Sequence, residues 1–113
     1  MIVHTELRSS IMLKMIPKTG YQNGSAARNL TNDEYHEITR MNSFPHLPIE
    51  ARHIDYSFYY DGFLPDFSLS ISYDLPLEMK IDTFTTKQGE FLEFRTTERK
   101  GDHQRVNYNI SES

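Results

Sequence analysis

The chain has no cysteine and no tryptophan among its 113 residues. The lack of cysteine excludes a disulfide framework, a thiolate nucleophile and any zinc site with cysteine ligands. Long apolar runs are also missing, because Lys14 interrupts the longest one, from Ile11 to Ile16. A membrane-spanning helix needs about 20 apolar residues, and the N-terminus lacks the pattern of a signal peptide. The sequence therefore predicts no transmembrane segment and, read as written, a cytoplasmic protein.

The chain carries no excess of positive charge. Its 12 basic and 16 acidic side chains give a formal net charge of -4, and the arginines are spread from Arg8 to Arg105. Proteins that bind nucleic acids usually gather lysine and arginine on one face. The balance therefore favours a protein partner and predicts no nucleic-acid partner.

Aromatic residues are abundant and concentrated in one region. The chain has seven phenylalanines and seven tyrosines, most of them between Tyr56 and Phe94. Aromatic and β-branched residues favour strands over helices. Since the length leaves room for one domain, we expect residues 1–113 to form a single α+β domain.

The clearest pattern is a pair of alternating segments. Residues 53–60 and 66–74 each place apolar and polar side chains in turn, which is typical of a strand with one buried and one wet face. The connector between them is too short for a helical crossover, so an antiparallel hairpin is predicted. Residues 91–94 and 106–110 are predicted to form a second hairpin, with Gly101 in its turn.

Two short helices are also predicted. Thr31 and Glu34 have the spacing of a capping box, which predicts a helix that begins after Thr31 and ends near Asn42. Pro76 suits the first turn of a second helix, which would end near Thr85.

The remaining segments complete an antiparallel sheet of about five strands, built from hairpins. Residues 11–16 are predicted to form a buried strand, with a short helix as the alternative. Residues 17–30, rich in small and polar side chains, are predicted to form a flexible loop. The predicted core consists of Ile54, Tyr56, Phe58, Phe67, Leu69, Ile71, Phe84, Phe94, Val106 and Tyr108.

The sequence offers little catalytic chemistry. The five histidines do not have the spacing of a metal site, and no glycine-rich phosphate loop or serine nucleophile motif occurs. His53 and Asp55 share one strand face, where they could form a polar pair for a small-molecule-binding or hydrolytic site. A solvated polar face explains the same pair more simply. We therefore expect no enzyme activity, no cofactor and no metal.

A binding surface is the stronger prediction. The wet face of the first hairpin would present Tyr59 together with Ser68 and Ser70, beside His53 and Asp55. Short serines leave a sheet flat, and a tyrosine ring makes a rigid contact of mixed polarity.

The connector of the same hairpin adds a second candidate contact. Phe63 and Leu64 stand at its tip, where exposed apolar side chains would mark a contact site. The alternative is that they fold back over the end of the core.

The run from Leu47-Pro48 through the hairpin to Phe84 resembles the layout of small bacterial envelope proteins. The resemblance implies no catalytic residue. It implies a periplasmic or lipid-anchored location, with Met1 standing where a leader was removed.

These features predict a non-catalytic interaction module that binds another protein, of inhibitor, immunity, anti-defence or envelope accessory type. The sequence leaves the oligomeric state open, a homo-oligomer included.

Overall fold

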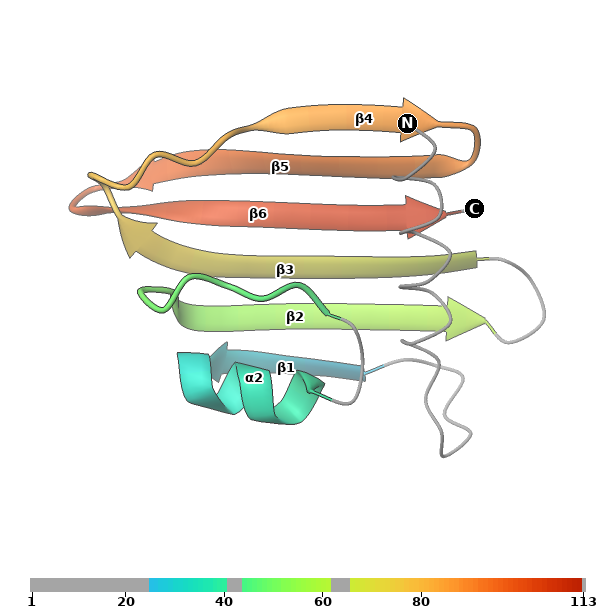
Figure 1. Cartoon of the computed structure of the whole chain (residues 1–113). Coiled ribbons are helices and arrows are strands. Elements are labelled where there is room, and N and C mark those ends of the chain that lie inside the picture. Colours follow the sequence, from blue (N-terminus) through green and yellow to red (C-terminus); the bar gives the residue numbers. More distant parts are fainter. Residues whose placement is uncertain (1–24, 41–43, 62–65, 113) are drawn as a thin grey trace.

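Six antiparallel strands form one sheet in the computed structural model, which describes residues 25–40, 44–61 and 66–112 (Figure 1). The strand order is β1-β2-β3-β6-β5-β4, so β3 and β6 are central and β1 and β4 are the edges. One short helix, α2, contacts β1 and β2. The elements are β1 (Ser25–Leu30), α2 (Asn32–Thr39), β2 (Arg52–Asp61), β3 (Asp66–Pro76), β4 (Phe84–Gln88), β5 (Phe91–Lys100) and β6 (His103–Glu112).

The structure confirms the predicted α+β class, the single domain and the antiparallel sheet. The predicted numbers of strands and helices were wrong. The sheet has six strands rather than about five, and the described residues contain one helix rather than two. Both predicted hairpins are present. In the first, Tyr56 pairs with Ile71 and Phe58 with Leu69. In the second, Gly101 has the positive φ, 75°, that the tight turn requires.

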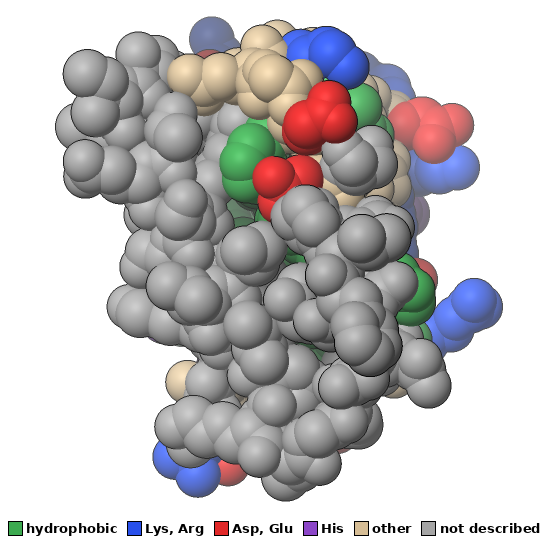
Figure 2. All heavy atoms as spheres, turned by 90° about the vertical axis from the view of Figure 1, so that its right-hand side faces the viewer, with side chains coloured by type: hydrophobic (Ala, Val, Ile, Leu, Met, Phe, Trp, Pro, Cys, Tyr) green, Lys and Arg blue, Asp and Glu red, His purple; other side chains and the backbone are tan. Residues whose placement is uncertain are grey.

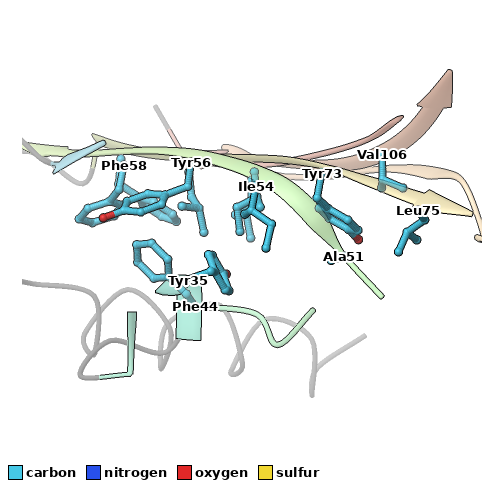
Figure 3. Close-up of a cluster of buried hydrophobic side chains, with 13 residues drawn as sticks. Tyr35, Phe44, Ala51, Ile54, Tyr56, Phe58, Tyr73, Leu75 and Val106 are labelled. Atoms are coloured by element: carbon cyan, nitrogen blue, oxygen red, sulfur yellow. The ribbon is translucent and has the colours of Figure 1, made fainter. Parts of the chain in front are cut away.

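The core lies on one side of the sheet. Apolar side chains of β2, β3 and β6 point toward α2 and residues 44–51, as Figure 3 shows in a view along the sheet. Edge-to-face contacts join the two layers: the ring centroids of Phe44 and Tyr56 lie 5.4 Å apart, and those of Tyr35 and Tyr56 lie 6.3 Å apart. The buried apolar residues are Tyr35, Phe44, Ala51, Ile54, Tyr56, Phe58, Phe67, Leu69, Ile71, Tyr73, Leu75, Val106 and Ile110.

The predicted capping box starts α2. The Thr31 hydroxyl accepts from the backbone N–H of Glu34 at 3.1 Å, and the Thr31 N–H donates to the Glu34 carboxylate at 2.9 Å. Tyr35 is fully buried, and its hydroxyl donates to the carbonyl of Pro45 at 2.7 Å. The helix ends at Thr39 rather than near Asn42. Its fixed start and its buried tyrosine hold residues 44–51 over the sheet.

The predicted second helix, from Pro76 to Thr85, was wrong. β3 continues through Pro76, residues 77–83 contain no helix, and β4 begins at Phe84. The buried Gln104 of β6 explains this, because its amide donates to the carbonyls of Pro76 at 2.9 Å and Met79 at 2.7 Å. A helix would use such carbonyls for its own backbone bonds. Here the Pro76 carbonyl accepts one turn bond, from the Met79 N–H at 3.2 Å, and the long-range Gln104 side chain binds both carbonyls.

The predicted loop over residues 17–30 also needs correction. Ser25–Leu30 is the edge strand β1, which pairs with β2, while residues 17–24 lie outside the described part of the chain. Asn29 has φ of 56°, and the register shifts between Ala27 and Leu30. This irregularity hides the period of two that marks a strand. The predicted strand over residues 11–16 lies outside the described residues.

Three predicted core residues are only partly buried: Phe84, Phe94 and Tyr108. Phe94 pairs with Asn109 and so projects from the face opposite the core. The other seven predicted core residues are buried as expected.

Candidate functional site

The face of the sheet opposite the core is a candidate site, because no element of the described chain covers it. α2, residues 44–51 and the packed side chains Met79 and Ile81 all lie on the core side. The alternation that buries the apolar side chains turns hydroxyl and amide side chains outward. This polar face consists of Ser57 and Tyr59 of β2, Ser68, Ser70 and Ser72 of β3, Asn107, Asn109 and Ser111 of β6, and Leu92, Phe94 and Thr96 of β5.

The centre of the polar face is ordered by its own hydrogen bonds. The Ser72 hydroxyl donates to the Asn107 side-chain carbonyl at 2.7 Å, and the Asn109 amide donates to the Ser70 hydroxyl at 2.5 Å. Both pairs span the two central strands, β3 and β6. The side chains are therefore already fixed in the free protein.

Two aromatic rings stand at the sides of this centre. Tyr59 on β2 is 42% exposed, and Phe94 on β5 is half-buried. Three strand spacings of about 4.8 Å separate these strands, or roughly 14 Å. The face thus combines a hydroxyl and amide centre with apolar contact points on both sides.

A charged cluster borders the polar face where β2 begins and β3 ends. The Arg105 guanidinium donates to Asp55 at 2.9 Å, to Asp74 at 3.0 Å and to the backbone carbonyl of His53 at 2.7 Å. The second carboxylate oxygen of Asp55 accepts from the backbone N–H of Asn29 at 2.8 Å. Arg105 therefore ties three strands together, from β6 through β3 to β2.

The backbone under this cluster is unusual. Asn29 and His53 both have positive φ, 56° and 50°, a conformation uncommon outside glycine. They face each other across a register shift between β1 and β2, and His53 Nδ1 lies 3.0 Å from the Asn29 side-chain oxygen. His53 therefore bonds Asn29, and the Asp55 carboxylate is held by Arg105 and Asn29.

A cavity of about 380 Å³ opens beside the cluster. His103 lies in its wall with Nε2 3.7 Å from Asp74 and Nδ1 2.9 Å from Asp102. The hydrogen bond from His103 holds the pKa of Asp102 below its ordinary value. The cavity is lined by Glu50, Arg52, His53, Asp74, Leu75, Pro76, Asp102 and His103.

A second concavity, of about 640 Å³, lies beside α2. His36 and His46 stack in its wall with ring centroids 5.2 Å apart. His36 Nδ1 lies 2.9 Å from the carbonyl of Asn32, and its Nε2 lies 3.4 Å from the N–H of Leu47. Through these two contacts His36 links α2 to the following segment.

At the opposite end of the sheet, two buried oxygens have no partner in the part of the chain that the structure describes: Gln88 Oε1 and Glu112 Oε1. Burial, and after it the charge of Glu90, raises the pKa of Glu112. Figure 2 faces this end and shows acidic and basic side chains near the turn between β4 and β5.

The predicted binding residues fall into two groups. Tyr59, Ser68 and Ser70 lie together on the polar face, and His53 and Asp55 lie at its border, in the Arg105 cluster. Phe63 and Leu64 lie outside the described residues.

Sequence reasoning missed part of the site. It did not identify Asn107, Asn109 and Arg105 of β6 or Leu92 of β5, and it assigned Phe94 to the core. The outward position of the asparagines was available from the alternation of Val106, Tyr108 and Ile110. The Arg105 cluster depends on the strand order, which the sequence does not give.

Three broader observations bear on the site. Among the described residues, no three histidine, aspartate or glutamate side chains are placed to hold a metal ion together. No helix within these residues is both long and apolar enough to cross a membrane. Comparison of the chain with protein-family models, curated proteins and solved structures gave no match.

Proposed function

We propose that the chain is a non-catalytic interaction module that docks another protein on its polar face. The observation that carries the proposal is the ordered, uncharged centre of that face, which the described elements leave open. An inhibitor, an immunity or anti-defence protein, or an envelope accessory protein would use a surface of this kind.

The chemistry of the face suits protein docking in two respects. Cores of protein interfaces are depleted of charged residues, and the centre of this face has hydroxyl and amide groups instead. Association also loses free energy when side chains become ordered. The bonds of Ser70 and Ser72 to β6 have already fixed these side chains, so little of that loss remains. Tyr59 offers a ring that can bury large area with few rotatable bonds.

The test is retention of a partner by purified protein on a resin, in extract of the native host. The double variant Tyr59→Ala, Ser70→Arg should retain less than a tenth of the partner that the wild type retains. Its melting temperature should change by no more than a few degrees, because neither side chain belongs to the core. Thr97→Arg is the matched control, since Thr97 is exposed on β5 and pairs with Val106, on the core side. Equal retention by the wild type and the double variant would refute the proposal.

A small-molecule site at the 380 Å³ cavity is the second candidate. It is favoured by the two histidines and Arg52 in the cavity wall, next to the positive φ of His53. A thermal-shift screen with small carboxylic acids and amines tests it. A compound that stabilises the wild type and not His53→Asn would support this candidate, and the absence of any such compound would oppose it.

A further inference from the structure

We infer that the protein docked on the polar face is a second copy of this chain, related by a two-fold axis that runs along the strands between β3 and β6. This inference rests on the proposed function, because it names the partner of the same face. Most soluble oligomers are symmetric, and a two-fold interface must be complementary to itself.

The strand order allows this self-complementarity. Three strands lie on each side of the line between β3 and β6: β1-β2-β3 on one side and β6-β5-β4 on the other. A two-fold axis that lies above the polar face, parallel to that line and midway between the two copies, places β3 of one copy over β6 of the other and β2 over β5. Each register pair of β3 and β6 is then repeated between the copies.

The central register pairs are the ones that such an arrangement needs. Ser70 pairs with Asn109 and Ser72 with Asn107 within one copy, so each serine would face the matching asparagine of the second copy. The hydrogen-bonding groups that these serines and asparagines do not use within one copy can bond across the two copies. The Ser70 hydroxyl accepts within its own copy and can donate to the Asn109 side-chain carbonyl of the other. The Ser72 hydroxyl donates within its own copy and can accept from the Asn107 amide of the other.

The charges of the face are compatible with the same axis. Two copies with a formal charge of -4 each repel one another at long range. The centre of the polar face carries no charge, so no like charges meet there. At its border Asp74 pairs with Arg105, and the axis sets each of them over the opposite charge of the second copy.

The outer side of the whole sheet, with β1 and β4 beside the polar face, has the size that a stable dimer needs. Its six strands contain 52 residues, and at about 4.8 by 3.4 Å for each residue they cover about 850 Å². A standard protein interface buries about 800 Å² on each partner. Tyr59 of one copy would lie over β5 of the other, which presents Leu92 and Phe94. Two sheets packed at about 30° keep the central strands close to alignment.

Sedimentation velocity over a hundredfold range of concentration tests the inference. The wild type should form a dimer, and Ser70→Arg should raise the dissociation constant at least tenfold, while Thr97→Arg on the core side should leave it unchanged. A monomeric wild type at every concentration would overturn the inference, and so would a dimer that persists in Ser70→Arg.

Two further measurements test the axis itself. The chain has no cysteine, so a short bismaleimide should cross-link Ser70→Cys copies into dimers and leave Thr97→Cys copies monomeric. The proposed axis places the new guanidinium of a Ser70→Arg copy opposite the new carboxylate of an Asn109→Asp copy. Mixing these two variants should therefore restore dimers, and a failure to restore them counts against the axis.

The two proposals can fail separately. If the wild type is monomeric but retention of another protein still depends on Tyr59 and Ser70, the second copy is excluded and the proposed function stands. If neither self-association nor retention depends on these two residues, both proposals fail.

Discussion

Replacement of Arg105 by methionine gives the sharpest test of how the border of the polar face is held. The Arg105 side chain is 19% exposed, and its guanidinium donates to two carboxylates and one backbone carbonyl. Methionine keeps much of the apolar stem and removes all three bonds. Asp55 and Asp74 would then face each other without a cation between them, and the carbonyl of His53 would lose its donor.

The expected loss follows from the exposure of each partner. The pair with Asp55, which is 43% exposed, should contribute roughly 0.2–1 kcal/mol. Asp74 is 17% exposed, and a hydrogen bond to a charged group contributes about 1.5–3 kcal/mol. Because these contributions overlap, Arg105→Met should lower the free energy of unfolding by about 2–4 kcal/mol. At roughly 4 °C per kcal/mol for a chain of this length, the melting temperature should fall by roughly 8–16 °C.

Urea unfolding followed by circular dichroism and tyrosine fluorescence measures the change. Lys100→Met is the matched control, because Lys100 pairs with Glu98 at 3.4 Å and both side chains are about half exposed. That control should change the free energy of unfolding by less than about 0.5 kcal/mol. If Arg105→Met loses no more than Lys100→Met, the three bonds of Arg105 do not stabilise the fold and the reasoning is refuted.

Three other substitutions have defined outcomes. His53→Gly should leave the free energy of unfolding within about 1 kcal/mol of the wild type, because glycine adopts the positive φ of this position without strain. His53→Val should lower the free energy of unfolding by about 1–3 kcal/mol, because a β-branched residue is strained there. Equal unfolding midpoints of the two variants in urea would contradict this. Burial raises the pKa of Glu112 with help from Glu90, so the wild type should lose stability relative to Glu112→Gln as pH rises past the ordinary glutamate pKa. Parallel curves of unfolding free energy against pH would refute this sign. Tyr35→Phe should lower the free energy of unfolding by about 1–2 kcal/mol, because the Pro45 carbonyl loses its donor. Burial also raises the pKa of Tyr35, so its favourable contribution should fade above about pH 10, the ordinary tyrosine pKa, and thermal melts of both proteins should converge there.

Local patterns predicted the parts of the fold that local forces determine. The period of two in residues 53–60 and 66–74 predicted the first hairpin, β2 and β3, and the spacing of Thr31 and Glu34 predicted the start of α2. Tyr59, Ser68 and Ser70 followed from the same alternation. These features depend only on residues near one another in the sequence, so a single chain is enough to find them.

Long-range contacts determine the features of the fold and of the site that the sequence did not predict. Gln104 binds the carbonyls of Pro76 and Met79 from β6, and this overrides the helical pattern of residues 77–83. β1 is held by pairing with β2, despite its small and polar composition. The missed half of the candidate site has the same origin, since Arg105 reaches Asp55 only because β6 lies beside β3.

The composition of the central strands supports the proposal that the polar face binds a partner. Strands favour β-branched and aromatic residues, and asparagine is depleted in them. Yet the outward positions of β3 include Ser70 and Ser72, and those of β6 include Asn107 and Asn109. Threonine would face solvent equally well and would suit the strands better. Positions that depart from local preference are where functional surfaces are expected. Since the core formed by the described residues lies on the other side, substitutions on this face can separate binding from stability.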